Sequence, residues 1–156
     1  MAPTTLILFA CAGMRTGVVQ VDDAGRVRVL PYAEGAGTTL HLSGDARALA
    51  GADGVIVEVT GPRAPGHLWV RDWRVLDAGD GAGGFVGVVR THGSRWVIDD
   101  RNTSTTLLVD DLSAARMRED GVRPGSTLLL SGHVVGGGIV TVFAYRTLLA
   151  TSAAAP

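Results

Sequence analysis

An internal repeat constrains the fold of this chain more than any other feature of its sequence. Gly17–Gln20 recurs later as Gly87–Arg90, and Trp73–Leu76 recurs as Tyr145–Leu148. The remaining matches are Arg26–Val29 with Arg95–Ile98, Thr38–Leu40 with Thr105–Leu107, and Thr60–Gly61 with Ser131–Gly132. Because all five matches keep the same order, we interpret the chain as two copies of one duplicated unit.

The repeat predicts two small units of structure. The first covers residues 15–77 and the second residues 84–150, joined by a glycine-rich linker at residues 78–83. Residues 1–14 are an apolar segment, interpreted as an extra strand or a lipoprotein-type signal, and residues 151–156 are a flexible tail. Units of this size are near the lower limit for an independent core, so we expect each to bury surface against the other or against a partner.

Alternating apolar and polar residues predict strands in the first unit, at residues 26–30, 40–42, 55–60 and 68–73. Asp22–Gly25 is a hairpin turn that separates the strand at 26–30 from a first strand before it. Asp45–Ala50 interrupts this pattern with strong helix formers behind a capping Asp. In the second unit Leu112–Asp120 repeats the helix, with Ser113 as the candidate cap. Each unit is therefore expected to contain five strands and one short helix.

A helix between the third and fourth of five strands is the order found in OB-fold barrels. The turn glycines and the strand Trp96–Asp99 make the second half resemble a bacterial OB-fold domain. The resemblance implies an all-β fold with short helices, built as two tandem five-stranded OB-fold-like barrels of bacterial or phage type. It implies little about function, because this fold hosts many unrelated activities.

The polar residues of the chain do not form a pattern that indicates catalysis. The net charge is −1, which excludes a chain-wide field that attracts polyanions. A single Cys excludes an internal disulfide framework and a cysteine-rich zinc site. The four His residues lack metal-ligand spacing, and adjacent Asp residues on a strand point to opposite faces. We therefore expect a non-enzymatic protein without cofactor or metal.

The first hypothesis for function is protein–protein contact within a larger assembly. Strict alternation along residues 68–73 places Leu68 and Val70 inward and leaves an outward aromatic stripe, which the second unit repeats. The predicted contact residues are Trp69, Arg71, Trp73, Phe143 and Tyr145. We expect this stripe to bind a protein partner or a second copy, or to form the seam between the barrels. Trp96 aligns with an inward valine and is predicted to be core.

The second hypothesis is binding of single-stranded nucleic acid. OB barrels that bind single strands use their second and third strands together with two loops. The candidate residues are Arg26, Arg28, Tyr32, Arg63, Arg90 and Arg95. Acidic pairs beside the same loops oppose this hypothesis because they would repel phosphate; they are Asp22 and Asp23, Asp99 and Asp100, and Asp110 and Asp111.

The third hypothesis concerns the N-terminal segment. Leu8–Cys11 resembles the lipobox of bacterial lipoproteins, which implies lipidation of Cys11 and an envelope location. The alternative is a buried strand with an ordinary interior Cys, in a cytoplasmic or particle-associated protein. The apolar run at residues 6–12 is too short to cross a bilayer as a helix, so no transmembrane span is expected.

Overall fold

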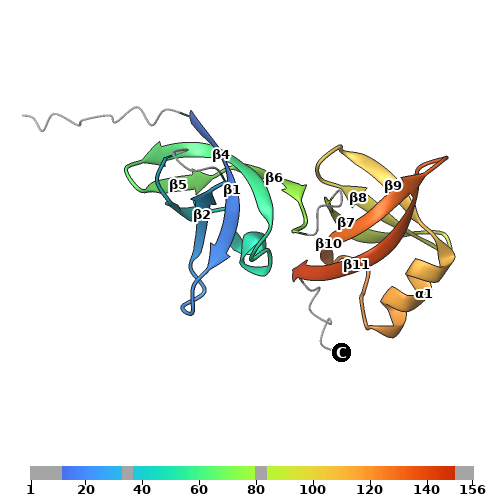
Figure 1. Cartoon of the computed structure of the whole chain (residues 1–156). Helices are drawn as coiled ribbons and strands as arrows, with labels where there is room; N and C mark the ends of the chain where they lie inside the picture. The colour runs from blue at the N-terminus through green and yellow to red at the C-terminus, as the bar shows by residue number, and fades with distance from the viewer. Residues whose placement is uncertain (1–11, 33–36, 80–83, 150–156) are drawn as a thin grey trace, which may run out of the picture.

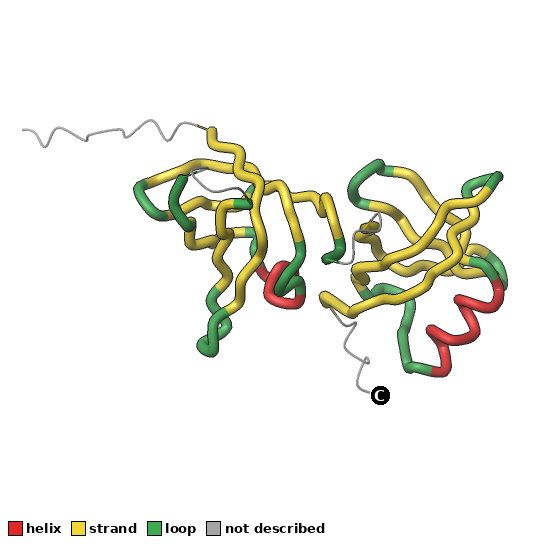
Figure 2. Tube along the Cα trace, in the orientation of Figure 1, coloured by secondary structure: helices red, strands yellow, loops and turns green. Residues whose placement is uncertain are grey.

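The computed structural model describes residues 12–32, 37–79 and 84–149, which form two closed β-barrels in tandem (Figure 1). Strands make up nearly all of both barrels, and the two short helices lie at their ends (Figure 2). The predicted all-β class with two five-stranded barrels is confirmed. Cys11, most of the linker and the C-terminal tail lie outside the described residues.

The first barrel begins at Ala12, three residues before the predicted start of the first unit. Its elements are β1 (Ala12–Val21), β2 (Val27–Pro31), β3 (Leu40–Gly44), the 3-10 helix η1 (Arg47–Gly51), β4 (Ile56–Ala64), β5 (His67–Val70) and β6 (Asp72–Asp77). The strands follow the order β1-β2-β3-β5-β4, and pairing of β1 with β4 closes the ring. β3 and β5 run parallel, whereas the other neighbours are antiparallel.

The second barrel repeats this topology. Its elements are β7 (Gly84–His92), β8 (Arg95–Asp100), β9 (Thr105–Val109), the helix α1 (Asp111–Glu119), β10 (Thr127–Val135) and β11 (Ile139–Leu149). β7 pairs with both β8 and β10, and β9 runs parallel to β11. β11 takes the place of β5 and β6 together, and this strand order is consistent with an OB-like fold.

The two barrels share their strand registers residue by residue. Val29 faces Leu40 in the first barrel, and the repeat-equivalent Ile98 faces Leu107 in the second. Three further pairings of the first barrel recur at the equivalent residues of the second. The pairings of the first barrel are Gly17–Val57, Glu58–Arg74 and Val59–Trp73. Their equivalents in the second barrel are, in the same order, Gly87–Leu128, Leu129–Arg146 and Leu130–Tyr145. The pairing thus follows the sequence repeat, as expected for a duplicated unit.

A bulge in the last strand of each barrel overturns part of the predicted stripe. Phe143 is the extra residue in β11, because Ser131 faces Ala144 while Gly132 faces Val142. Arg71 holds the equivalent place between β5 and β6. One extra residue reverses the alternation of the strand beyond it. Trp69 therefore points outward, whereas Trp73 turns into the core and is only 3% exposed.

Each barrel has its own core, and the first core extends across the seam between them. Trp96, 6% exposed, packs in the second core, as predicted. The first core includes Val86, Leu129 and Leu148, which belong to strands of the second barrel. The apolar contact predicted for such small units is thus made between the two barrels.

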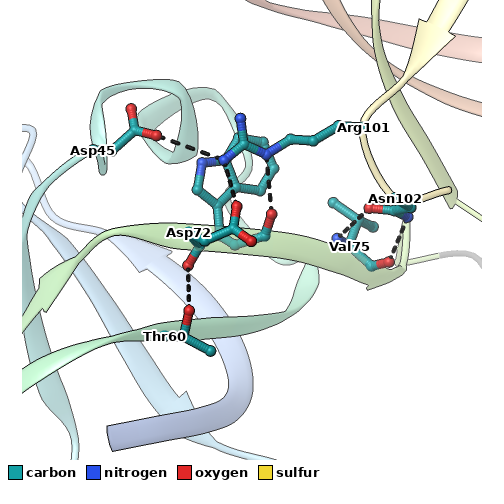
Figure 3. A network of polar contacts seen from close by, with 7 residues as sticks. Asp45, Thr60, Asp72, Val75, Arg101 and Asn102 are labelled. Carbon is teal, nitrogen blue, oxygen red and sulfur yellow. Dashed lines mark hydrogen bonds and ion pairs between the residues drawn. The ribbon is translucent and has the colours of Figure 1, made fainter. Parts of the chain in front are cut away.

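Arg101 and Asn102, in the turn after β8, hold the seam with polar contacts (Figure 3). The Arg101 guanidinium donates to the Trp73 carbonyl at 3.1 Å and pairs with Asp72 at 2.8 Å, while lying 4.6 Å from the centroid of the Trp73 indole ring. The Asn102 amide bonds both the backbone N–H and the carbonyl of Val75, at 3.2 and 2.8 Å. This amide acts as a substitute peptide group along the edge of β6.

The caps of both helices differ from the predicted ones. Asp110, not Ser113, caps α1: its carboxylate accepts the backbone N–H groups of Leu112 and Ser113 at 3.1 and 3.0 Å. η1 has no side-chain cap, and Asp45 instead pairs with Arg101 at 3.6 Å across the seam. A short polar side chain after a strand can cap a helix or bond another side chain, and the sequence alone does not show which it does.

Candidate functional site

Three basic side chains, one arginine and two histidines, form a row across β2, β3 and β5 on the outside of the first barrel. Arg28 of β2 faces His41 of β3, and His41 faces His67 of β5. The two imidazole rings contact each other, with centroids 5.3 Å apart and planes tilted by 31°. Residues directly opposite one another on neighbouring strands share a face, so the three side chains gather at one place.

Trp69 stands beside this row on β5 and is 59% exposed. Its indole rests on the backbone of Gly44, since a Cβ at Gly44 would lie 2.7 Å from the indole Nε1 and 3.0 Å from Cδ1. A side chain at Gly44 would thus displace the ring. Glycine at this position leaves room for an aromatic surface that is supported on one side and open to solvent on the other.

The charges around the row favour an anionic ligand. The Nε of Arg28 is buried and has no hydrogen-bond partner within the described ranges. No salt bridge of the described residues engages Arg28, His41 or His67. Asp22, one of the predicted acids, lies in the β1–β2 turn and pairs with Arg26: the backbone N–H of Arg26, then its side chain, holds the Asp22 pKa below its usual value.

The six residues predicted for nucleic-acid binding are divided between the barrels. Of these, only Arg28 lies in the row, while the exposed Tyr32 follows the end of β2. Arg63 lies at the end of β4, with its Cβ against Gly13. Arg26 pairs with Asp22, and in the second barrel Arg90 pairs with Asp99 while Arg95 is exposed at the start of β8. These six residues therefore do not form one continuous face.

The predicted partner-binding stripe is also divided. Phe143 and Trp69 are exposed on separate barrels, and Arg71 and Phe143 are the bulge residues. The phenol of Tyr145 donates to the Asp120 carboxylate. Burial, together with that hydrogen bond, raises the pKa of Tyr145 to about 12. With Trp73 buried, the five residues do not form one surface.

A groove of about 550 Å³ lies between α1 and β11 in the second barrel. Two exposed apolar side chains border it: Leu112, 82% exposed, and Phe143, 61% exposed. Leu112 was not among the residues predicted to bind a partner. A helical projection could have found it, because Ala114 and Met117 mark the buried side of α1 and leave Leu112 facing outward.

The pairing of His41 with His67 was not expected from the sequence, because the spacing of the four histidines does not indicate it. The available signal was the strand order itself. An OB-like order pairs the third strand with the fifth in parallel, which brings His41 and His67 into register. The strand predicted at residues 68–73 leaves His67 just outside it, whereas β5 begins at His67.

Comparison with known proteins adds no assignment: no protein-family model matches the chain, and no curated protein matches it significantly. Within the described ranges, no group of three or more His, Cys, Asp or Glu side chains is placed to hold a metal ion. None of the helices there has the length and apolar character needed to cross a membrane. The molecule is thus defined by its class, a tandem pair of closed five-stranded barrels with an OB-like strand order.

Proposed function

We propose that the protein is a non-catalytic binding module of the OB-fold superfamily, and that its first barrel binds single-stranded nucleic acid across β2, β3 and β5. The row of Arg28, His41 and His67 beside the open indole of Trp69 carries this proposal. Basic side chains next to an aromatic platform are the combination that proteins use to hold single strands.

Local contacts must supply the binding free energy, since the net charge of −1 supplies no attraction from the molecule as a whole. Stacking of one base on an aromatic side chain contributes about 1–3 kcal/mol by alanine substitution. An indole already supported by Gly44 loses little conformational freedom when a base stacks on it. Binding is therefore expected to be weak to moderate and to weaken as salt rises.

Fluorescence anisotropy with labelled single-stranded oligonucleotides at low salt tests the proposal. Trp69→Ala is expected to weaken binding by about tenfold or more, from the loss of stacking. Phe143→Ala is the matched control, because Phe143 is an equally exposed aromatic on the other barrel. Absence of binding by the wild-type protein, or equal losses in the two variants, would overturn the proposal.

Protein–protein contact is a second candidate, and one observation favours it. Leu112 and Phe143 border the groove between α1 and β11, which leaves apolar surface uncovered on the second barrel. If a partner or second copy binds there, the wild-type protein should form complexes in size-exclusion chromatography with light scattering that Leu112→Ser abolishes. Unchanged monomers in both proteins at high concentration would contradict self-association.

Lipidation of Cys11 stays a prediction from the sequence, because this residue lies outside the described ranges. Mass spectrometry of the native N-terminus tests it. A lipid-modified Cys11 at the terminus would support the envelope alternative, and an intact Met1 would exclude it.

A further inference from the structure

The second barrel carries aliphatic residues at the three positions of the row. Val97 faces Leu108, and Leu108 faces Ile139, in the same registers that join Arg28, His41 and His67. A barrel of this topology can therefore form with apolar side chains at these three positions. The three nitrogen-bearing side chains of the first barrel are not a requirement of folding, and their chemistry needs another explanation.

The row places the hydrogen-bond donors of three neighbouring side chains on one face of the sheet. A guanidinium offers five N–H donors in a fixed plane, and each imidazole offers at least one. The Arg28 Nε is buried without a partner among the described residues, and within them neither His41 nor His67 makes a side-chain hydrogen bond. Such a cluster is complementary to a compact oxyanion, because planar guanidinium groups bind phosphate oxygens in pairs.

We propose that Arg28, His41 and His67 form a binding site for a phosphate monoester group. A monoester offers three terminal oxygens and up to two negative charges, whereas the phosphodiester inside a strand has only two free oxygens and one charge. Three donor side chains at one point match the monoester. That the phosphate belongs to a nucleic acid rests on the proposed function. In that case this face holds a strand by its terminal phosphate.

Titration with inorganic phosphate at constant pH and ionic strength, followed by NMR of the histidine ring protons, tests the site directly. We expect His41 and His67 to shift and saturate, while His92 and His133 of the second barrel serve as internal controls. No shift, or equal shifts of all four histidines, would overturn the proposal. This readout does not depend on any oligonucleotide.

The second barrel supplies a variant that is expected to fold. Arg28→Val, His41→Leu and His67→Ile together install the residues that its twin carries in the same registers. This triple variant, made with Arg28→Gln as a milder form, should lose phosphate binding by about tenfold or more, the size expected for lost charge-assisted hydrogen bonds. Circular dichroism checks the fold, and unchanged phosphate affinity in a folded Arg28→Gln protein would contradict the site.

Oligonucleotides with a 5′-phosphate, with a 3′-phosphate and with neither distinguish the sources of the group. Tighter binding of one phosphorylated form, competed by free phosphate, assigns the site to a strand end. A nucleoside monophosphate that binds as tightly as the oligomer assigns it to a small ligand. If all three oligomers bind equally and free phosphate does not compete with them, the monoester site fails, while weaker oligomer binding by Trp69→Ala and Arg28→Gln keeps the proposed function. If phosphate shifts the histidine resonances but no oligomer binds, the phosphate site is supported and the proposed function is contradicted.

Discussion

Gly17 and Gly87 occupy the point where the first strand of each barrel is paired on both sides. Gly17 faces both Pro31 and Val57, and Gly87 faces the equivalent residues of its own barrel. A Cβ at Gly17 would lie 2.0 Å from the Leu30 carbonyl oxygen, and one at Gly87 would lie 2.6 Å from the Asp99 carbonyl oxygen. The backbones approach too closely for any side chain, and so the duplicated unit keeps glycine in both copies.

Substitution by alanine at either glycine is expected to destabilise the protein, because neighbouring backbone must move. Gly17→Ala and Gly87→Ala should each lower the free energy of unfolding by about 1–3 kcal/mol in urea denaturation. Gly136→Ala is the control, since a Cβ there meets nothing within 4 Å. Similar effects for all three substitutions would contradict a role for close backbone approach.

Single residues show how far sequence reasoning can go. The repeat aligned Val29 with Ile98 and Leu40 with Leu107. The structure pairs Val29 with Leu40 and Ile98 with Leu107 in equivalent registers, because a barrel tolerates no slip without turning its core outward. Alternation failed at Trp73, because a bulge adds a residue without any local sequence signal. His41 and His67 were missed for a different reason: they lie far apart in sequence, and only the parallel pairing joins them.

The helix α1 depends on Asp110, which closes its first turn. Burial raises the Asp110 pKa, but the Ser113 hydroxyl and the backbone N–H groups of Ser113 and Leu112 outweigh it, so the net pKa is lowered. The Ser113 hydroxyl in turn accepts the Val142 backbone N–H at 3.0 Å. The cap thus links α1 to β11, next to the groove.

Loss of this cap should lower stability in a pH-dependent way. Asp110→Ala is expected to cost about 1 kcal/mol at neutral pH. Because the folded pKa lies below the unfolded value of 3.8, the contribution is present above that value and is lost as pH falls through the lower folded pKa. The difference between wild type and Asp110→Ala, followed by urea denaturation, should therefore shrink below pH about 4. Asp111→Ala should have a smaller effect, and equal effects would contradict the cap.

At the element scale, the sequence predicted where the helices fall but not what caps them. Ser113 and Asp45 are both typical caps by residue type. Asp110 took the first role because it directly follows β9, with extended backbone angles that suit a cap. Asp45 forms an ion pair with Arg101 of the other barrel, and no local sequence pattern indicates this partner.

For the whole molecule, the seam is expected to make the two barrels unfold as one. Arg101 and Asn102 bond the backbone of β6, and the core of the first barrel includes side chains from the second. The double variant Arg101→Ala, Asn102→Ala should destabilise the first barrel by at least about 2 kcal/mol, because the backbone groups of β6 lose their hydrogen-bond partners.

Tryptophan fluorescence follows both barrels in a Trp69→Phe background, since Trp73 lies in the first core and Trp96 in the second. In that background Trp96→Phe leaves Trp73 as the reporter of the first core, and Trp73→Phe leaves Trp96 as the reporter of the second. One shared transition is expected for the background protein, and an earlier Trp73 transition for the double variant. Arg74→Ala removes an ion pair within the first barrel and should leave the transitions together. Separate transitions in the unaltered background would show that the seam does not couple the barrels.

Leu148, almost the last described residue, packs in the core of the first barrel, against η1. During synthesis on the ribosome, this leucine emerges long after the first barrel's own strands have left the exit tunnel. Until then the nascent barrel carries an uncovered apolar surface, which is the state that chaperones recognise and that aggregates most readily. The first half of this chain is therefore made first but completed last.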